Sequence, residues 1–180
     1  MSADKDTEAT FPRWQKKRIF VRELAGGYDD LWQQLVNQPR VYKSKHKPFD
    51  EDSAIMAGKH MINPQETQVA QFVDCDIEVI GPGQYSQKHG HMNSAVMYVL
   101  EGKGHEIHDG VRYDWEAGDA ILVGNARVHQ HFNDSDTDPV RLVVLKAKPL
   151  FLFLSLLFQK NVTLPPTAPL PGFEDWRATD

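Results

Sequence analysis

Histidines at alternate positions are the residues of this sequence best suited to do chemistry. His89 and His91 form an H-x-H pair after a glycine turn, and His129 and His131 repeat that spacing further along the chain. Residues i and i+2 of a strand face the same side, so both rings of a pair can point into one pocket. Imidazole binds iron, copper, nickel and zinc. We expect His89, His91 and His129 to hold a metal ion with open positions for substrate or oxygen.

The elements that must position these rings are short strands. Residues 69–80 alternate apolar and polar side chains, as a half-buried strand does, and residues 95–100 are rich in β-forming residues. Further strands are expected at 120–123 and 140–146, with turns at 81–83, 101–104 and 109–110, the last two as hairpins. Closely spaced short strands indicate an antiparallel sandwich or barrel, and the absence of an internal repeat indicates a single one.

The region before the strands carries weaker signals. Residues 14–24 fit a short strand or an arm, and residues 29–37 fit a helix with two aspartates in its first turn. Residues 38–68 are polar and irregular, so we expect a long surface connection there.

The region after the strands begins with the longest apolar run, residues 149–158. This run is too short to span a bilayer, so we expect it in the core or in a contact between subunits. The proline-rich tail from residue 161 is expected to be extended and exposed. Three parts are therefore predicted: an N-terminal arm and helix at 1–68, a barrel at 69–147, and the apolar segment with its tail at 148–180.

Composition excludes several classes of protein. The chain has 180 residues, a formal net charge of −5 and a pI near 5.9, which does not suit nucleic-acid binding. Its one cysteine, Cys75, cannot form an intrachain disulfide and fits a buried strand position. The polar, acidic start is not a secretory signal, so the cytoplasm is the expected compartment.

Two segments resemble the two sequence motifs of the cupin family. The first is residues 83–102, in which four positions agree with the motif: Gly83, His89, His91 and Gly102. Ala95 stands where that motif has a glutamate. The second is residues 118–133, in which Gly118, His129 and Asn133 agree, whereas Gly124 and Ala126 replace a proline and a glycine. The resemblance covers about residues 69–147 and implies a single mainly β jelly-roll barrel.

Within that family, the string HGHMNSAVMYVLEGKG is most similar to the gentisate and salicylate dioxygenases, which also have an alanine in the glutamate position. The resemblance implies a three-histidine iron site in which no carboxylate ligates the metal. A dication then keeps its full charge, which favours anionic chelating substrates such as enolates and phenolates.

The same resemblance defines an expected substrate pocket. The group typically has an arginine at the position of Met97, so the pocket here should be more apolar. Arg127 either supplies a carboxylate-binding guanidinium or is a solvent-facing loop residue. Ala95, Gln87 and Tyr98 are further candidates for the pocket wall.

The remaining histidines have weaker assignments. His131 is expected beside the metal, where it orients water or substrate. His105 and His108 differ in strand parity, so at least one should lie at the surface. His46 and His60 are expected to be structural or exposed.

These observations favour a non-haem Fe(II) dioxygenase that cleaves a hydroxylated aromatic or diketone-type substrate with O2. Mn, Ni or Zn would also suit three imidazoles. Two alternatives remain open: a non-redox isomerase, decarboxylase or lyase that acts through a metal enolate, and a non-catalytic small-molecule-binding cupin. The expected partners are a small-molecule substrate, O2 and further copies of the chain in a homodimer or higher homo-oligomer, without nucleic acid or membrane.

Overall fold

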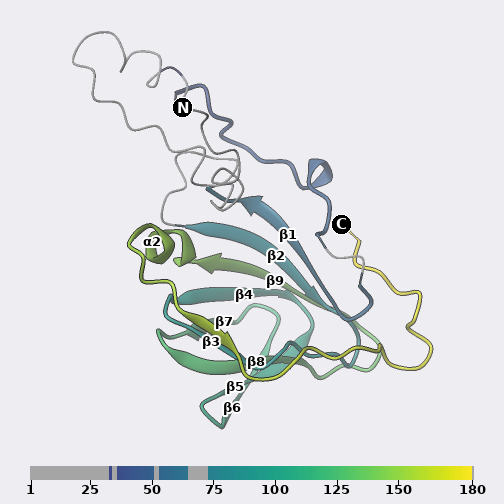
Figure 1. Ribbon diagram of the computed structural model, residues 1–180. Coiled ribbons are helices and arrows are strands. Elements are labelled where there is room, and N and C mark those ends of the chain that lie inside the picture. The colour runs from purple at the N-terminus through teal and green to yellow at the C-terminus, as the bar shows by residue number, and fades with distance from the viewer. Residues whose placement is uncertain (1–32, 34–35, 51–52, 65–72, 180) are drawn as a thin grey trace, which may run out of the picture.

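The chain folds into two antiparallel β-sheets that face each other. The computed structural model describes residues 33, 36–50, 53–64 and 73–179 (Figure 1). One sheet has the order β1-β2-β9-β4-β7 and the other the order β10-β3-β8-β5-β6. The strands of the first sheet are β1 (Met56–Ile62), β2 (Asp74–Ile80), β9 (Val140–Lys146), β4 (Ala95–Glu101) and β7 (Ala120–Val123). Those of the second are β10 (Gln159–Asn161), β3 (His89–His91), β8 (Arg127–Asn133), β5 (Lys103–His108) and β6 (Val111–Glu116). The predicted mainly β, jelly-roll architecture is confirmed.

The inner faces of the two sheets differ in polarity. On β4, Ala95, Met97 and Val99 are buried while the residues between them face outward. The apolar core is made almost wholly by the first sheet, with one residue from β6: Ile80, Ala95, Met97, Val99, Trp115, Ile121, Val123, Val140, Leu142 and Val144. On β8 the buried alternate positions are polar, namely His129, His131 and Asn133. The inner face of the first sheet therefore carries the apolar core, whereas that of the second sheet is rich in imidazole.

Strand β1 corrects the expectation of an irregular connection at 38–68. It pairs with β2 in antiparallel register, with Met56 opposite Ile80. Its central residue Lys59 is only 2% exposed. The Lys59 ammonium donates to Ser44 Oγ at 3.1 Å and lies 4.4 Å from the centre of the Phe49 ring. These non-local partners make burial of a lysine tolerable, and the local sequence does not reveal them.

The two expected hairpins have different outcomes. At 109–110 the hairpin is confirmed, because β5 and β6 pair and both Asp109 and Gly110 have positive φ. At 101–104 the hairpin is wrong: β4 pairs with β7 and β9, whereas β5 pairs with β6 and β8. Gly102, with φ 88°, instead carries the chain from one sheet to the other.

The C-terminal segment returns to the barrel. The apolar run begins as helix α2 (Lys148–Phe153), and several of its side chains are exposed, including Phe153 and Phe158. Strand β10 then pairs with β3, and near the end Arg141 Nη2 donates to the Thr179 carbonyl at 2.7 Å. Among the described residues no helix is long and apolar enough to cross a membrane. The predicted subunit contact stays a prediction.

Most residues to which the N-terminal predictions refer are not described by the structure. The arm at 14–24 and residues 69–72 of the expected strand lie outside the described residues. The helix at 29–37 is described in part, with Gln33 and Val36 helical.

Asp74, at the start of β2, is a partly buried carboxylate whose surroundings disfavour its negative charge. Its Oδ1 is buried and has no hydrogen bond within the described part of the chain. Burial and the neighbouring Asp76 carboxylate raise the pKa of Asp74 to about 6. The folded state therefore binds this proton more tightly than the unfolded state does, and stability falls as the pH rises from about 4 to above 6.

We therefore predict that Asp74→Asn stabilises the protein at pH 7.5. The amide has the same shape but no charge to bury, and the gain is about 1–2 kcal/mol after allowing for solvent screening at this partly exposed site. Urea denaturation at pH 7.5 and pH 4 measures the effect, which should shrink towards zero at pH 4. Asp175→Asn, at an exposed position, is the matched control and should change little. Equal or lower stability of Asp74→Asn at pH 7.5 would contradict the analysis.

Candidate metal centre

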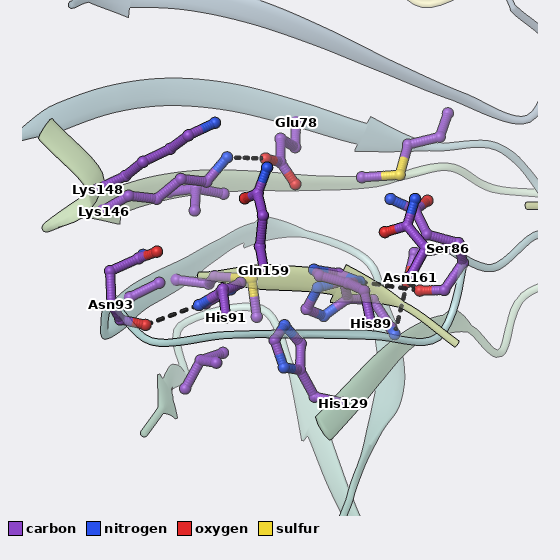
Figure 2. Close-up of a pocket in the computed structure, with 17 residues that line it drawn as sticks. Glu78, Ser86, His89, His91, Asn93, His129, Lys146, Lys148, Gln159 and Asn161 are labelled. Carbon is purple, nitrogen blue, oxygen red and sulfur yellow. Dashed lines mark hydrogen bonds and ion pairs between the residues drawn. The ribbon is translucent and has the colours of Figure 1, made fainter. Parts of the chain in front are cut away.

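Strands β3 and β8 bring three histidines together. In their antiparallel register His89 lies directly opposite His129, and His91 follows two residues later on the same face. The ring centres of His89 and His129 are 4.3 Å apart, and those of His91 and His129 are 4.8 Å apart. Figure 2 shows the three rings converging on one side of a cavity.

Gly90 allows the two strands to approach closely at this point. A Cβ at position 90 would lie 3.3 Å from both the Arg127 carbonyl oxygen and Val128 Cγ2. A side chain there would require β8 atoms to shift by a few tenths of an ångström, so glycine suits the close packing of the two strands at this position.

Backbone carbonyls fix the orientation of all three rings. The Nδ1 atom of His89 bonds the Gln87 carbonyl at 3.0 Å, that of His91 bonds the Asn93 carbonyl at 2.7 Å, and that of His129 bonds the Arg127 carbonyl at 2.9 Å. A carbonyl only accepts, so each Nδ1 carries the proton and each Nε2 is left as a lone-pair donor.

The three rings are held in the neutral form that a metal requires. Burial lowers the pKa of His89, His91 and His129, and that of His129 falls to about 3. One nitrogen from each ring lies within 4.8 Å of the others. Three neutral, pre-oriented imidazoles form a donor set that fits a first-row transition metal or zinc.

A buried glutamate that sequence reasoning missed supports the fourth histidine. His131 Nδ1 lies 2.6 Å from Glu106 Oε2, and the Glu106 side chain is fully buried. Burial alone would lower the pKa of His131, but the Glu106 carboxylate outweighs it and raises that pKa. Strand parity offered a signal for Glu106, because residues 104, 106 and 108 share the inner face of β5.

The two other histidines of β5 are both largely buried, so the expectation of a surface position is wrong. His105 stacks on Phe132 and bonds Asp134 at 2.7 Å. The His108 side chain is 15% exposed and its Nε2 lies 3.5 Å from Glu106 Oε2.

A cavity of about 330 Å³ lies in front of the rings. Its wall includes all four histidines of β3 and β8 together with three of the expected pocket residues, Ala95, Met97 and Gln87. Tyr98 does not line it, because its neighbours Met97 and Val99 face inward and Tyr98 is 47% exposed on the outer face. Arg127 does not line it either; its guanidinium is exposed and pairs with Asp109 at 2.9 Å. The solvent-facing alternative for Arg127 is thus the one observed.

The rest of the wall includes residues that the sequence did not single out. From the first sheet and α2 come Met56, Glu78, Val144, Lys146 and Lys148, and from β10 come Gln159 and Asn161. The charged residues come from β2, β9 and α2, and only the long-range pairing of these elements places them beside the histidines.

Known proteins share parts of this fold and sequence. Residues 76–146 match the family described as Cupin domain. Among curated proteins, the chain is 28% identical over 105 residues to 1-hydroxy-2-naphthoate 1,2-dioxygenase from Nocardioides sp. (strain KP7), covering 56% of this chain and 27% of that protein. It is 31% identical over 90 residues to 5-aminosalicylate 1,2-dioxygenase from Comamonas sp., covering 49% of this chain and 23% of that protein. The chain is thus similar to part of two dioxygenases and spans about a quarter of their length.

Solved structures agree on the fold. The salicylate 1,2-dioxygenase of Pseudaminobacter salicylatoxidans superposes with a TM-score of 0.55 at 18% identity, over 74% of this chain and 35% of that one. An RmlC-like cupin from Shewanella frigidimarina superposes with a TM-score of 0.51 at 18% identity, over 61% of this chain and 91% of that one.

We predict that His129→Ala abolishes tight metal binding. The variant removes one of three nitrogen donors, so the affinity for Co(II) should fall at least about 100-fold. Such a fall exceeds the usual effect of removing a residue that only hydrogen-bonds a metal ligand. Isothermal titration measures the affinity, and His105→Asn is the matched control because His105 is buried but does not line the cavity. Unchanged Co(II) binding by His129→Ala would refute the assignment.

Proposed function

We propose that this protein is a non-haem Fe(II) dioxygenase that cleaves a hydroxylated aromatic or enolic substrate with O2. The observation that carries the proposal is the ligand set itself: His89, His91 and His129 converge as neutral donors. Ala95 in the cavity wall leaves no carboxylate at the position where cupins usually have one. The relation to aromatic ring-cleaving dioxygenases supports the same reaction class.

The charge of the site favours a chelating anion. Neutral ligands leave a bound dication with its full positive charge, so a substrate that offers adjacent phenolate, enolate or carboxylate oxygens binds best. A cavity of about 330 Å³ is at the small end of ligand sites and suits a substrate of about one ring.

The roles of the protein residues follow from their placement. His89, His91 and His129 would hold the metal, which when bound supplies the electron transfer between substrate and oxygen that protein side chains cannot supply. His131 lines the cavity with its Nδ1 bonded to Glu106, and we assign it the role of hydrogen-bonding a substrate oxygen through Nε2. Met97 and Val144 give the wall an apolar part on which a ring can pack.

An oxygen electrode tests the proposal directly. The protein is loaded with Fe(II) under anaerobic conditions and then mixed with O2 and salicylate, gentisate, 1-hydroxy-2-naphthoate or a β-diketone. We expect stoichiometric oxygen uptake with at least one of them, and no uptake when Zn(II) replaces Fe(II). Absence of uptake across the panel with iron bound would reject the dioxygenase. Turnover with Zn(II) and without oxygen would favour the non-redox lyase or isomerase instead.

Substitution of His131 separates its role from metal binding. We predict that His131→Asn lowers kcat by about 10- to 100-fold, because a positioned side chain that hydrogen-bonds the reacting group typically contributes that much. Iron content should stay close to that of the unmodified protein, because His131 is not in the ligand set. A variant that keeps full turnover would exclude His131 from the reaction.

A further inference from the structure

The cavity wall that faces the three histidines carries a fixed ion pair. Lys146 of β9 and Glu78 of β2 both line the cavity, and their Nζ and Oε1 atoms are 2.6 Å apart. Figure 2 shows this pair across the cavity from the rings, with Lys148 beside it. The rings come from the second sheet and the pair from the first, so a molecule in the cavity lies between them.

Further ionic contacts behind the wall hold Lys146 in place. Its Nζ also lies 3.1 Å from Asp76 Oδ2, and Asp76 Oδ1 lies 2.7 Å from His60 Nδ1. His60 Nε2 in turn lies 2.9 Å from Asp50 Oδ2. Several partners make a largely buried ammonium tolerable and restrict its position, so Glu78 is bound to a cation that has little freedom to move.

The second oxygen of Glu78 has no such partner. Within the described part of the chain Oε2 makes no hydrogen bond, although the Glu78 side chain is only 14% exposed. Figure 2 shows this oxygen directed into the cavity. Burial alone would raise the pKa of Glu78, but the Lys146 ammonium overcomes it and lowers that pKa. The group is therefore a carboxylate at neutral pH, which accepts hydrogen bonds and does not donate them.

We propose that Glu78, positioned by Lys146, determines substrate specificity by accepting a hydrogen bond from a hydroxyl or amino group of the substrate, on the side remote from the metal. The inference rests on the proposed function, because a chelating substrate places its metal-binding oxygens at the histidines and its far side at Glu78. A charged acceptor in the cavity wall discriminates strongly, because a bound substrate that lacks the donor covers the carboxylate without pairing it.

Two ligands that differ in one group test the proposal. Gentisate is salicylate with an added 5-hydroxyl, which lies para to the 2-hydroxyl and away from the chelating oxygens. Isothermal titration of the full-length Fe(II)-loaded protein without oxygen gives the ratio of the two affinities independently of turnover. We expect gentisate to bind about tenfold or more tightly than salicylate, as a charge-assisted hydrogen bond predicts.

Variants at two neighbouring carboxylates isolate the contribution of Glu78. In Glu78→Met, which keeps the volume and removes the acceptor, the affinity ratio should fall at least about fivefold below that of the unmodified protein. Any electronic effect of the hydroxyl on chelation is common to both proteins and cancels. Glu78→Gln keeps a neutral acceptor and should give at least a threefold fall in the ratio. Asp76→Asn is the matched control: it removes the other carboxylate bound to Lys146 but does not line the cavity, so the ratio should stay within about twofold of that of the unmodified protein.

The outcomes separate this inference from the proposed function. If both ligands bind and Glu78→Met keeps the original affinity ratio, the role of Glu78 is overturned and the dioxygenase proposal stands. Glu78→Gln decides the same question if Glu78→Met does not fold. If neither ligand binds the iron-loaded protein, this inference fails, and the oxygen-electrode panel, which also contains 1-hydroxy-2-naphthoate and a β-diketone, still decides the proposed function. If the affinity ratio falls as much in Asp76→Asn as in Glu78→Met, the preference for gentisate comes from the combined charge of Asp76, Glu78 and Lys146. That result would overturn the direct contact between Glu78 and the substrate.

Discussion

The pairing of β3 with β8 is the constraint on which the site depends. Direct opposition of His89 and His129 sets the spacing of the rings, and the carbonyls of the same two strands and their flanks hold the Nδ1 protons. Position and tautomer are therefore both fixed by the backbone, and neither relies on flexible side chains. A one-residue slip in this register would turn the β3 rings to the outside of the sheet.

The two sheets contribute different kinds of side chain to the interior of the protein. The first sheet supplies nearly all the apolar core, while the second places imidazoles and a buried glutamate on its inner face. A polar inner face costs stability unless its groups are bonded. A carbonyl and a carboxylate bond His91 and His131, whereas Glu106 Oε1 and His108 Nε2 are buried without a hydrogen bond among the described residues. The large apolar contribution of the first sheet offsets that cost, which explains why the two faces are so unlike.

Sequence reasoning succeeded where the information is local. Strand parity and the spacing of His89, His91 and His129 predicted the convergence that the structure shows, and the strands at 120–123 and 140–146 have the expected bounds. It failed where partners are distant along the chain. The Glu78–Lys146 pair depends on β2 lying beside β9, and the turn at Gly102 depends on which sheet each neighbouring strand joins. Tyr98 was wrongly expected to line the pocket. The alternation of β4 that correctly places Met97 on the inner face places Tyr98 on the outer face.

Strand β10 shows that the boundary of the family match is not the boundary of the folded unit. A recombinant fragment ending at residue 146 would keep all three metal-site histidines but lose the strand that bonds the outer side of β3. The three-residue β3 would become an edge with bare amides and carbonyls, open to pairing with other molecules. Expression, tagging and domain grafting should accordingly treat the C-terminal segment as part of the barrel.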